Sequence, residues 1–209
     1  MMKKSTIIFF AIMVFIIPVS AWALLNWYEK KVQVLPIMGK TKQHRIGDFY
    51  LTNQDGQLKT TADWKDNIVI ADFFFTHCPT ICPQMTKSLK KIQEAFKTDT
   101  EIIISSFTVD PERDSSAQLK KYARQYNLDT RNWNLLTGDK KEIYKLARNS
   151  FMIVATDGDG GPEDFIHSEK LVLVDKQKRI RGYYDGTSDT EVNQLISDIR
   201  QQIARKTDK

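Results

Sequence analysis

Cys78 and Cys82 are the residues of this chain that most clearly could do chemistry. They are its only cysteines, and three residues separate them. Residues four apart at the start of a helix face the same way, so the two sulfurs could close on one another or share one metal ion. The positive end of a helix dipole also lowers the pKa of a thiol, and the thiolate is both nucleophile and metal ligand. The spacing predicts a redox-active or metal-binding pair; the alternatives are a structural disulfide and two buried thiols.

The flanking segments place this pair where a buried strand turns into a helix. Residues 68–75 form a nearly unbroken apolar run, which is typical of a strand buried on both faces. The pattern after the pair predicts a helix over residues 82–97. Its apolar positions recur at helical spacing and are Leu89, Ile92 and Phe96. Pro83 suits the first helical turn, because its φ is already helical and the N–H that it lacks would have had no partner there.

The remaining pattern predicts an α/β domain with one mixed sheet. Strands and helices alternate, and a terminal hairpin and a last helix close the domain. The other predicted strands are residues 49–52, 57–59, 102–109, 133–136, 171–175 and 179–184, and the other predicted helices are residues 115–126, a short helix opened by residues 137–139, and residues 189–205. The cysteine pair then occupies the first βα turn, at the carboxyl end of a strand, where open α/β sheets place their sites.

The N-terminus carries a candidate membrane segment. Two lysines precede residues 6–25, which hold no charge and are just long enough to span a bilayer. Lysines before the segment favour a single span with the remainder of the chain outside the cytoplasm. A cleaved signal peptide is the alternative, because Ala21-Trp22-Ala23 resembles a cleavage site. We expect an anchor or signal peptide at residues 1–25, a linker at residues 26–46 and a domain at residues 47–205.

Composition narrows the choice of partners. The chain has 209 residues and a formal net charge of +5, with charges of both signs interspersed. No basic stripe with interleaved aromatic residues and no nucleic-acid motif is present in the sequence, so we do not expect nucleic-acid binding. His44 lies in the predicted linker, where we expect a solvent-exposed side chain.

Residues 76–83, Thr-His-Cys-Pro-Thr-Ile-Cys-Pro, resemble the signature of the SCO1/SenC family. Members of this family are thioredoxin-fold copper proteins that assist assembly of cytochrome c oxidase. Further matching segments follow in the family's order, at residues 110–115, 135–138 and 164–169. The resemblance covers about residues 47–205 and implies a thioredoxin-like sheet flanked by helices. From the residues alone, 110–115 is explained as a capped turn with an Arg–carboxylate pair.

The resemblance also implies a ligand set for copper, as Cu(I) or Cu(II). It consists of Cys78, Cys82 and His167, a soft set that suits this metal. Zinc usually takes a fourth protein ligand, and the sequence offers no obvious one. Without the resemblance, His167 would be interpreted as a structural histidine. Many relatives carry an acidic residue directly before this histidine, whereas this chain has Ile166 there. Met85 is expected to pack in the core.

The function that the resemblance implies is that of a metallochaperone rather than an enzyme. Copper would pass to the dinuclear copper site of cytochrome c oxidase subunit II, and another copper chaperone or a thiol reductase would be a further partner. The protein would be an uncleaved, single-pass protein of the bacterial cytoplasmic membrane, with its domain on the extracytoplasmic side. The alternative is a thiol–disulfide oxidoreductase, in which Cys78 and Cys82 form a redox-active disulfide and keep the target cysteines reduced.

Overall fold

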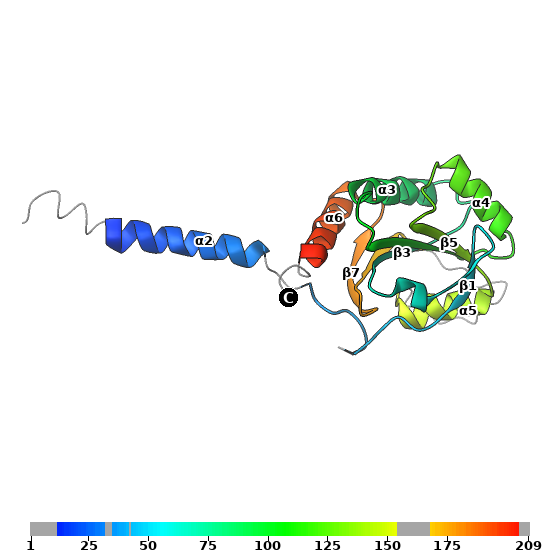
Figure 1. Cartoon of the computed structure of the whole chain (residues 1–209), viewed down its shortest axis with the longest axis horizontal. Helices are drawn as coiled ribbons and strands as arrows, with labels where there is room; N and C mark the ends of the chain where they lie inside the picture. The colour runs from blue at the N-terminus through cyan, green and yellow to red at the C-terminus, as the bar shows by residue number, and fades with distance from the viewer. Residues whose placement is uncertain (1–11, 32–34, 42, 154–167, 205–209) are drawn as a thin grey trace, which may run out of the picture. The chain divides into compact units, whose positions relative to one another are not determined.

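The computed structural model describes residues 12–31, 35–41, 43–153 and 168–204 (Figure 1). The chain separates into two compact units, residues 1–35 and 36–209. In the first unit, a π-helical turn η1 (Ile12–Ile16) leads into α2 (Ile17–Lys31), which continues past the predicted end of the apolar segment at Leu25. Within the described ranges, no helix combines the length and apolar character that crossing a membrane requires.

One mixed sheet forms the centre of the second unit. Among the residues that the structure describes it has seven strands, in the order β2-β1-β5-β4-β3-β6-β7. β3 pairs in parallel with β4, and β4 with β5, whereas the other neighbours are antiparallel. The strands are β1 (Tyr50–Asn53), β2 (Leu58–Thr60), β3 (Ile68–Phe74), β4 (Ile102–Thr108), β5 (Trp133–Thr137), β6 (Lys170–Val174) and β7 (Ile180–Asp185).

Helices cover both faces of this sheet. Figure 1 shows α3, α4 and α6 on one face and α5 on the other. The helical segments are the 3₁₀ turn η2 (Thr61–Trp64), α3 (Ile81–Ala95), α4 (Ser116–Gln125), α5 (Lys140–Lys145), the π-helical turn η3 (Leu146–Ser150) and α6 (Asp189–Ala204). Each parallel connection, from β3 to β4 and from β4 to β5, passes through a helix, as parallel neighbours require. The result is a thioredoxin-like α/β fold with a mixed sheet, as expected.

The predicted elements around the cysteine pair are confirmed. β3 ends at Phe74, one residue before the predicted end, and all of its residues are buried. α3 begins at Ile81 and presents a buried face that includes Leu89 and Ile92. The turn between β1 and β2 contains Asp55-Gly56, with Gly56 at a φ of +75°, a conformation that glycine adopts at little cost.

A cluster of aromatic side chains supports the sheet below the site. Phe73 on β3 and Phe107 on β4 are stacked, with ring centroids 5.1 Å apart. Phe151 meets Phe73 edge-on at 5.3 Å, and Trp64 and Phe49 extend the cluster. Such aromatic pairs add to the stabilisation that comes from burial, so they help to hold the end of β3 in place.

The chain before β1 is attached to the domain by a segment that we call the strap, residues 36–46. The Met38 N–H donates to the Ile180 carbonyl (2.9 Å), and the Ile46 N–H donates to the Lys178 carbonyl (2.8 Å). The Ile46 side chain is 3% exposed. The strap therefore pairs with the start of β7 and with the turn that precedes it.

The prediction that His44 is a solvent-exposed linker residue is wrong. Its side chain is half-buried, and Nε2 lies 2.7 Å from the carbonyl oxygen of Ser150. The physical reason is that backbone hydrogen bonds to β7 and to the turn before it hold the strap against the domain.

Candidate functional site

The turn between β3 and α3 brings the two cysteines together. The Cys78 N–H donates to the Phe75 carbonyl (3.3 Å), which closes the turn, and Cys82 is the second residue of α3. Thr80, at the N-cap position, makes no side-chain capping hydrogen bond. Instead, the Cys82 N–H donates to Cys78 Sγ at 3.3 Å. The sulfur of Cys78 therefore takes the role that a capping oxygen usually has at a helix start.

The two thiols differ strongly in their proton affinity. Burial raises the pKa of Cys78, but hydrogen bonds from the Cys82 side chain and from the backbone N–H groups of Cys82, Thr80 and Ile81 outweigh it, so the pKa is lowered overall. Burial is the main cause that raises the pKa of Cys82 far above its ordinary value, and its neighbour Cys78 adds to the effect. Cys78 is thus the more acidic thiol and Cys82 the buried partner.

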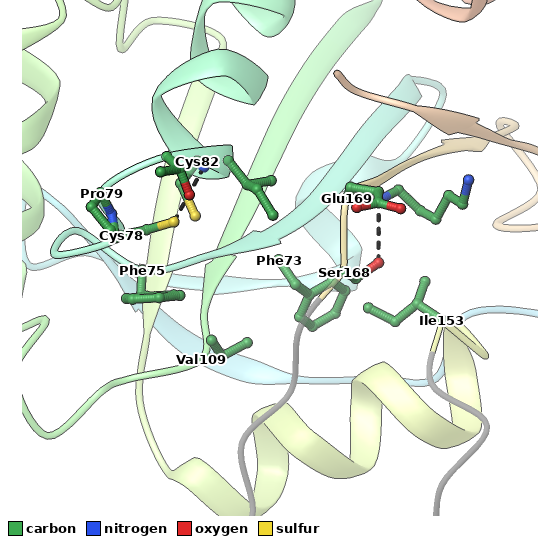
Figure 2. Close-up of a pocket in the computed structure, with 12 residues that line it drawn as sticks. Phe73, Phe75, Cys78, Pro79, Cys82, Val109, Ile153, Ser168 and Glu169 are labelled. Carbon is green, nitrogen blue, oxygen red and sulfur yellow. Dashed lines mark hydrogen bonds between the residues drawn. The ribbon is translucent and has the colours of Figure 1, made fainter. Parts of the chain in front are cut away.

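Both cysteines line a cavity of about 370 Å³. Figure 2 shows Cys78 and Cys82 on one side of it and Ser168 and Glu169 on the other. Its other walls are largely apolar and include Phe73, Phe75, Val109 and Ile153. An open cavity with two thiols beside apolar side chains, and with polar side chains opposite them, can accept a soft metal ion or a disulfide of another molecule.

The third predicted ligand, His167, lies outside the described residues. Its neighbour Ser168 is described and lines the same cavity as the two cysteines. Within the described ranges, no group of three or more His, Cys, Asp or Glu side chains is arranged to hold a metal ion. Of the three predicted ligands, the described residues include Cys78 and Cys82, and these two lie together at one wall of the cavity.

Two other residues near the motif are not part of this cavity. Met85 is 1% exposed, and the prediction that it packs in the core is confirmed. The side chain of His77 is 55% exposed, and its Nδ1 lies 3.1 Å from Thr76 Oγ1 and 3.9 Å from Asp114 Oδ1. The ring of His77 thus lies beside Thr76 and Asp114.

Asp114, which lies in the motif at residues 110–115, has a role that the sequence did not predict. The predicted Arg–carboxylate pair is present between Arg113 and Asp110, at 3.8 Å. Asp114 instead is fully buried and accepts hydrogen bonds from the backbone and hydroxyl of Thr76 in the cysteine turn. The only sequence signal for it was the match to the family motif.

Asp72, an acidic residue within the apolar run of β3, was also overlooked. It is 2% exposed and accepts a hydrogen bond from Ser106 Oγ (2.5 Å), which in turn accepts one from Trp133 Nε1 (2.9 Å). Burial is the main cause that raises its pKa to about 7, against a lowering by Ser106. Its charge is one of the influences that raise the pKa of Cys82. A lone carboxyl group in a buried strand is a signal that the sequence did offer.

Comparison with known proteins identifies relatives along the whole domain. The SCO1 protein homolog of Bacillus subtilis (strain 168) is 35% identical over 159 residues, which cover 75% of this chain and 82% of the relative. The structure of BsSco, a member of the Sco family of cytochrome c oxidase assembly proteins in which a disulfide switch was identified, has a TM-score of 0.68 and 33% identity; the match covers 81% of this chain and 97% of that one.

A copper-bound relative has the same fold. The structure of Arabidopsis thaliana ScoI with copper bound has a TM-score of 0.61 and 26% identity, and the match covers 76% of this chain and 98% of that one. The sequence model of the SCO1/SenC family matches residues 38–204, which include the strap from Met38 onward and every strand of the sheet. This chain therefore belongs to the SCO1/SenC family.

Proposed function

We propose that this protein is a copper-binding assembly factor that delivers copper to the dinuclear copper site of cytochrome c oxidase subunit II. The observation that carries the proposal is the pair Cys78 and Cys82, whose sulfurs share one turn at the wall of an open cavity. The family, the copper-bound ScoI of Arabidopsis thaliana and the oxidase-assembly family of BsSco support the same function.

We assign the copper ligands to Cys78, Cys82 and His167. The two thiols fit a soft ion, because both cysteines lie on the same side of one cavity and thiolates are soft ligands. The position of Ser168 supports the third ligand, since consecutive Cα atoms lie about 3.8 Å apart and Ser168 lines the cavity. Two thiolates and one neutral imidazole could hold either Cu(I) or Cu(II).

In delivery, the chain's own residues act as an exchangeable ligand set. Cys78 and Cys82 as thiolates, with neutral His167, receive copper from a donor such as another copper chaperone. Thiolates and imidazoles of the target then replace them one at a time, so the ion is never released to water. Cys78 is the ligand open to such exchange, because it is half-exposed whereas Cys82 is buried.

A second function, thiol–disulfide exchange, is favoured by the difference between the two thiols. The Cys78 thiolate would attack a target disulfide, forming a mixed disulfide and releasing one target thiolate. The Cys82 sulfur, after losing its proton, would then attack Cys78, releasing the second target thiol and leaving a Cys78–Cys82 disulfide. A thiol reductase would return the pair to the dithiol. The disulfide switch of BsSco supports this chemistry.

The location that we propose is the bacterial cytoplasmic membrane, with residues 1–25 as a single-pass anchor, residues 26–46 as the linker and residues 47–205 as the extracytoplasmic domain. The uncharged run at residues 6–25 and the preceding lysines support it. The strap shows that the second half of the linker pairs with the domain. Carbonate extraction of cells tests the anchor: the full chain should stay in the membrane pellet, and recovery in the supernatant would contradict it.

A titration with Cu(I) tests the ligand set. The reduced full-length chain in detergent should bind one equivalent tightly, and His167→Ala and Cys78→Ser should each lose that binding. His77→Ala is the matched control, because it removes a histidine beside Cys78 that contacts Asp114 and should retain binding. If His167→Ala binds copper as well as the wild type while both reduce a model disulfide equally, the oxidoreductase function replaces the chaperone.

A further inference from the structure

Asp114 lies beneath the cysteine turn and is the most fully engaged carboxylate near the site. It has no exposed surface. Its Oδ2 accepts the backbone N–H of Thr76 (3.0 Å) and the hydroxyl of Thr108 (2.5 Å), and its Oδ1 accepts the hydroxyl of Thr76 (2.5 Å). Hydrogen bonds to a carboxylate are stronger than those between neutral groups, so this cluster holds its partners firmly.

These contacts join three elements that are separate in the sequence. Thr76 belongs to the turn and stands two residues before Cys78, whereas Thr108 is the last residue of β4. Asp114 itself stands next to α4, which adds a contact of its own: Gln118 Nε2 donates to Thr76 Oγ1 (3.1 Å). The first part of the cysteine turn is therefore tied to β4 and α4 through one carboxylate.

The turn before α4 does not need Asp114 as a helix cap. Ser115 is the N-cap residue of α4, and its hydroxyl oxygen accepts the Gln118 N–H (3.3 Å). The side-chain oxygens of Asp114 accept from Thr76 and Thr108. Capping of α4 therefore does not account for the contact between Asp114 and Thr76.

We propose that Asp114 is a positioning residue for the cysteine pair. Asp114 holds the backbone of Thr76, two residues before Cys78. It thereby fixes the path of the turn and keeps Cys78 Sγ in the position where it accepts the Cys82 N–H. It thereby determines how tightly the pair binds a soft metal ion and how readily the two sulfurs form a disulfide. The metal half of this inference rests on the proposed function; the disulfide half does not.

Two variants of the full-length chain in detergent test the inference. Asp114→Asn keeps the shape but removes the negative charge that strengthens the hydrogen bonds from Thr76 and Thr108. Thr76→Val removes the hydroxyl, with its contacts to Asp114, Gln118 and His77, but keeps the backbone N–H contact to Asp114, and it serves if Asp114→Asn does not fold. Thr76→Ser retains the hydroxyl and should restore wild-type behaviour. Asp198→Asn is the matched control: Asp198 is buried on α6 and also accepts with both oxygens, from Tyr184 and Gln194.

Two measurements are made on each variant. The first is Cu(I) affinity by competition with a chromogenic chelator. The second is the equilibrium of the protein dithiol with oxidised glutathione, which yields the protein disulfide and two reduced glutathiones. For Asp114→Asn and Thr76→Val we expect both constants to fall, by roughly 10- to 100-fold for metal affinity, the usual loss for residues that orient ligands. Thr76→Ser and Asp198→Asn should stay near the wild-type values.

The outcomes separate this inference from the proposed function. If folded Asp114→Asn and Thr76→Val keep wild-type copper affinity and disulfide equilibrium, the positioning role is overturned. The same follows if Asp198→Asn produces equal losses, since the effect would then be general destabilisation. If the wild-type chain binds no copper but Asp114→Asn still shifts the glutathione equilibrium, the proposed function fails and the positioning role stands.

Discussion

Cys78 and Cys82 are the same chemical group in two different environments. Cys82 is 5% exposed and packed at the start of α3, whereas Cys78 is half-exposed and accepts N–H groups of the helix start. The pKa of Cys78 is lowered and that of Cys82 is raised. This division gives the pair one accessible sulfur, which can start copper exchange or disulfide exchange, and one protected sulfur.

We therefore expect iodoacetamide at neutral pH to alkylate Cys78 faster than Cys82, by more than about tenfold, because only the thiolate reacts and Cys78 has more of it. Peptide mass spectrometry at short times measures both rates. In Cys82→Ser, Cys78 should remain reactive, since the backbone N–H groups still reach its sulfur. Equal rates for the two cysteines would contradict the assigned difference.

Asp72 makes the stability of the fold depend on pH. Its pKa is about 7 in the folded chain and near 3.8 when unfolded. Between these values the folded state keeps a proton that the unfolded state has released, so raising the pH favours unfolding. The stabilisation is complete below about pH 4 and is lost as the pH rises through 7, by at most about 4 kcal/mol.

Asp72→Asn should remove this dependence. An amide cannot ionise, and it still accepts from the Ser106 hydroxyl, so we expect the variant to be more stable than the wild type at pH 8 and similar at pH 4. Urea unfolding at several pH values, followed by tryptophan fluorescence, measures the free energy of unfolding. A variant with the same slope between pH 4 and 7 as the wild type would show that another group carries the effect.

At the scale of elements, the sequence predicted those strands and helices whose pattern is local. The apolar run of β3 and the apolar stripe of α3 give their ends to within one or two residues, because burial on both faces or on one face leaves a distinct periodicity. Contacts between distant segments leave no such pattern. Thr76 and Asp114 are 38 positions apart, and the strap meets β7 across more than half of the chain.

The strap is held by a buried ion pair. Arg181 is 5% exposed, lies 3.0 Å from Asp175 Oδ2 through Nη1, and donates through Nε to the Pro36 carbonyl (3.1 Å). Removing one partner of a buried pair leaves the other charge poorly compensated, although Arg179 still contacts Asp175. We expect Arg181→Met to lower the free energy of unfolding by roughly 2–4 kcal/mol, measured by urea unfolding.

The control for this variant is Lys97→Met. Lys97, just after α3, pairs with Glu94 in its last turn, with both side chains more than 60% exposed, and its removal should leave stability almost unchanged. Hydrogen exchange provides a second readout, because Arg181→Met should speed exchange of the Met38 amide, which bonds to Ile180 of β7, and of the Ile46 amide, which bonds to Lys178 in the preceding turn. Unchanged exchange at both amides would mean that the strap does not depend on the pair.

At the scale of the whole molecule, the site lies where separate parts of the chain meet. The cysteine turn follows β3, Val109 follows β4, and Ile153 and Ser168 come from the far side of the cavity. These parts come together only when the sheet is formed. A ligand that uses this geometry binds the folded state and so stabilises the whole domain.

Copper should therefore raise the melting temperature of the chain. At a free Cu(I) concentration about 1,000 times the dissociation constant, binding adds about 4 kcal/mol, and for a domain of this size that corresponds to roughly 8–16 °C. This is an upper value, because thiols of the unfolded chain also bind the metal. The double variant Cys78→Ser/Cys82→Ser should show no rise, and a Cu(I) chelator should return the wild type to its original melting temperature. An equal rise in the double variant would place the metal elsewhere and remove the link between this cavity and the stability of the fold.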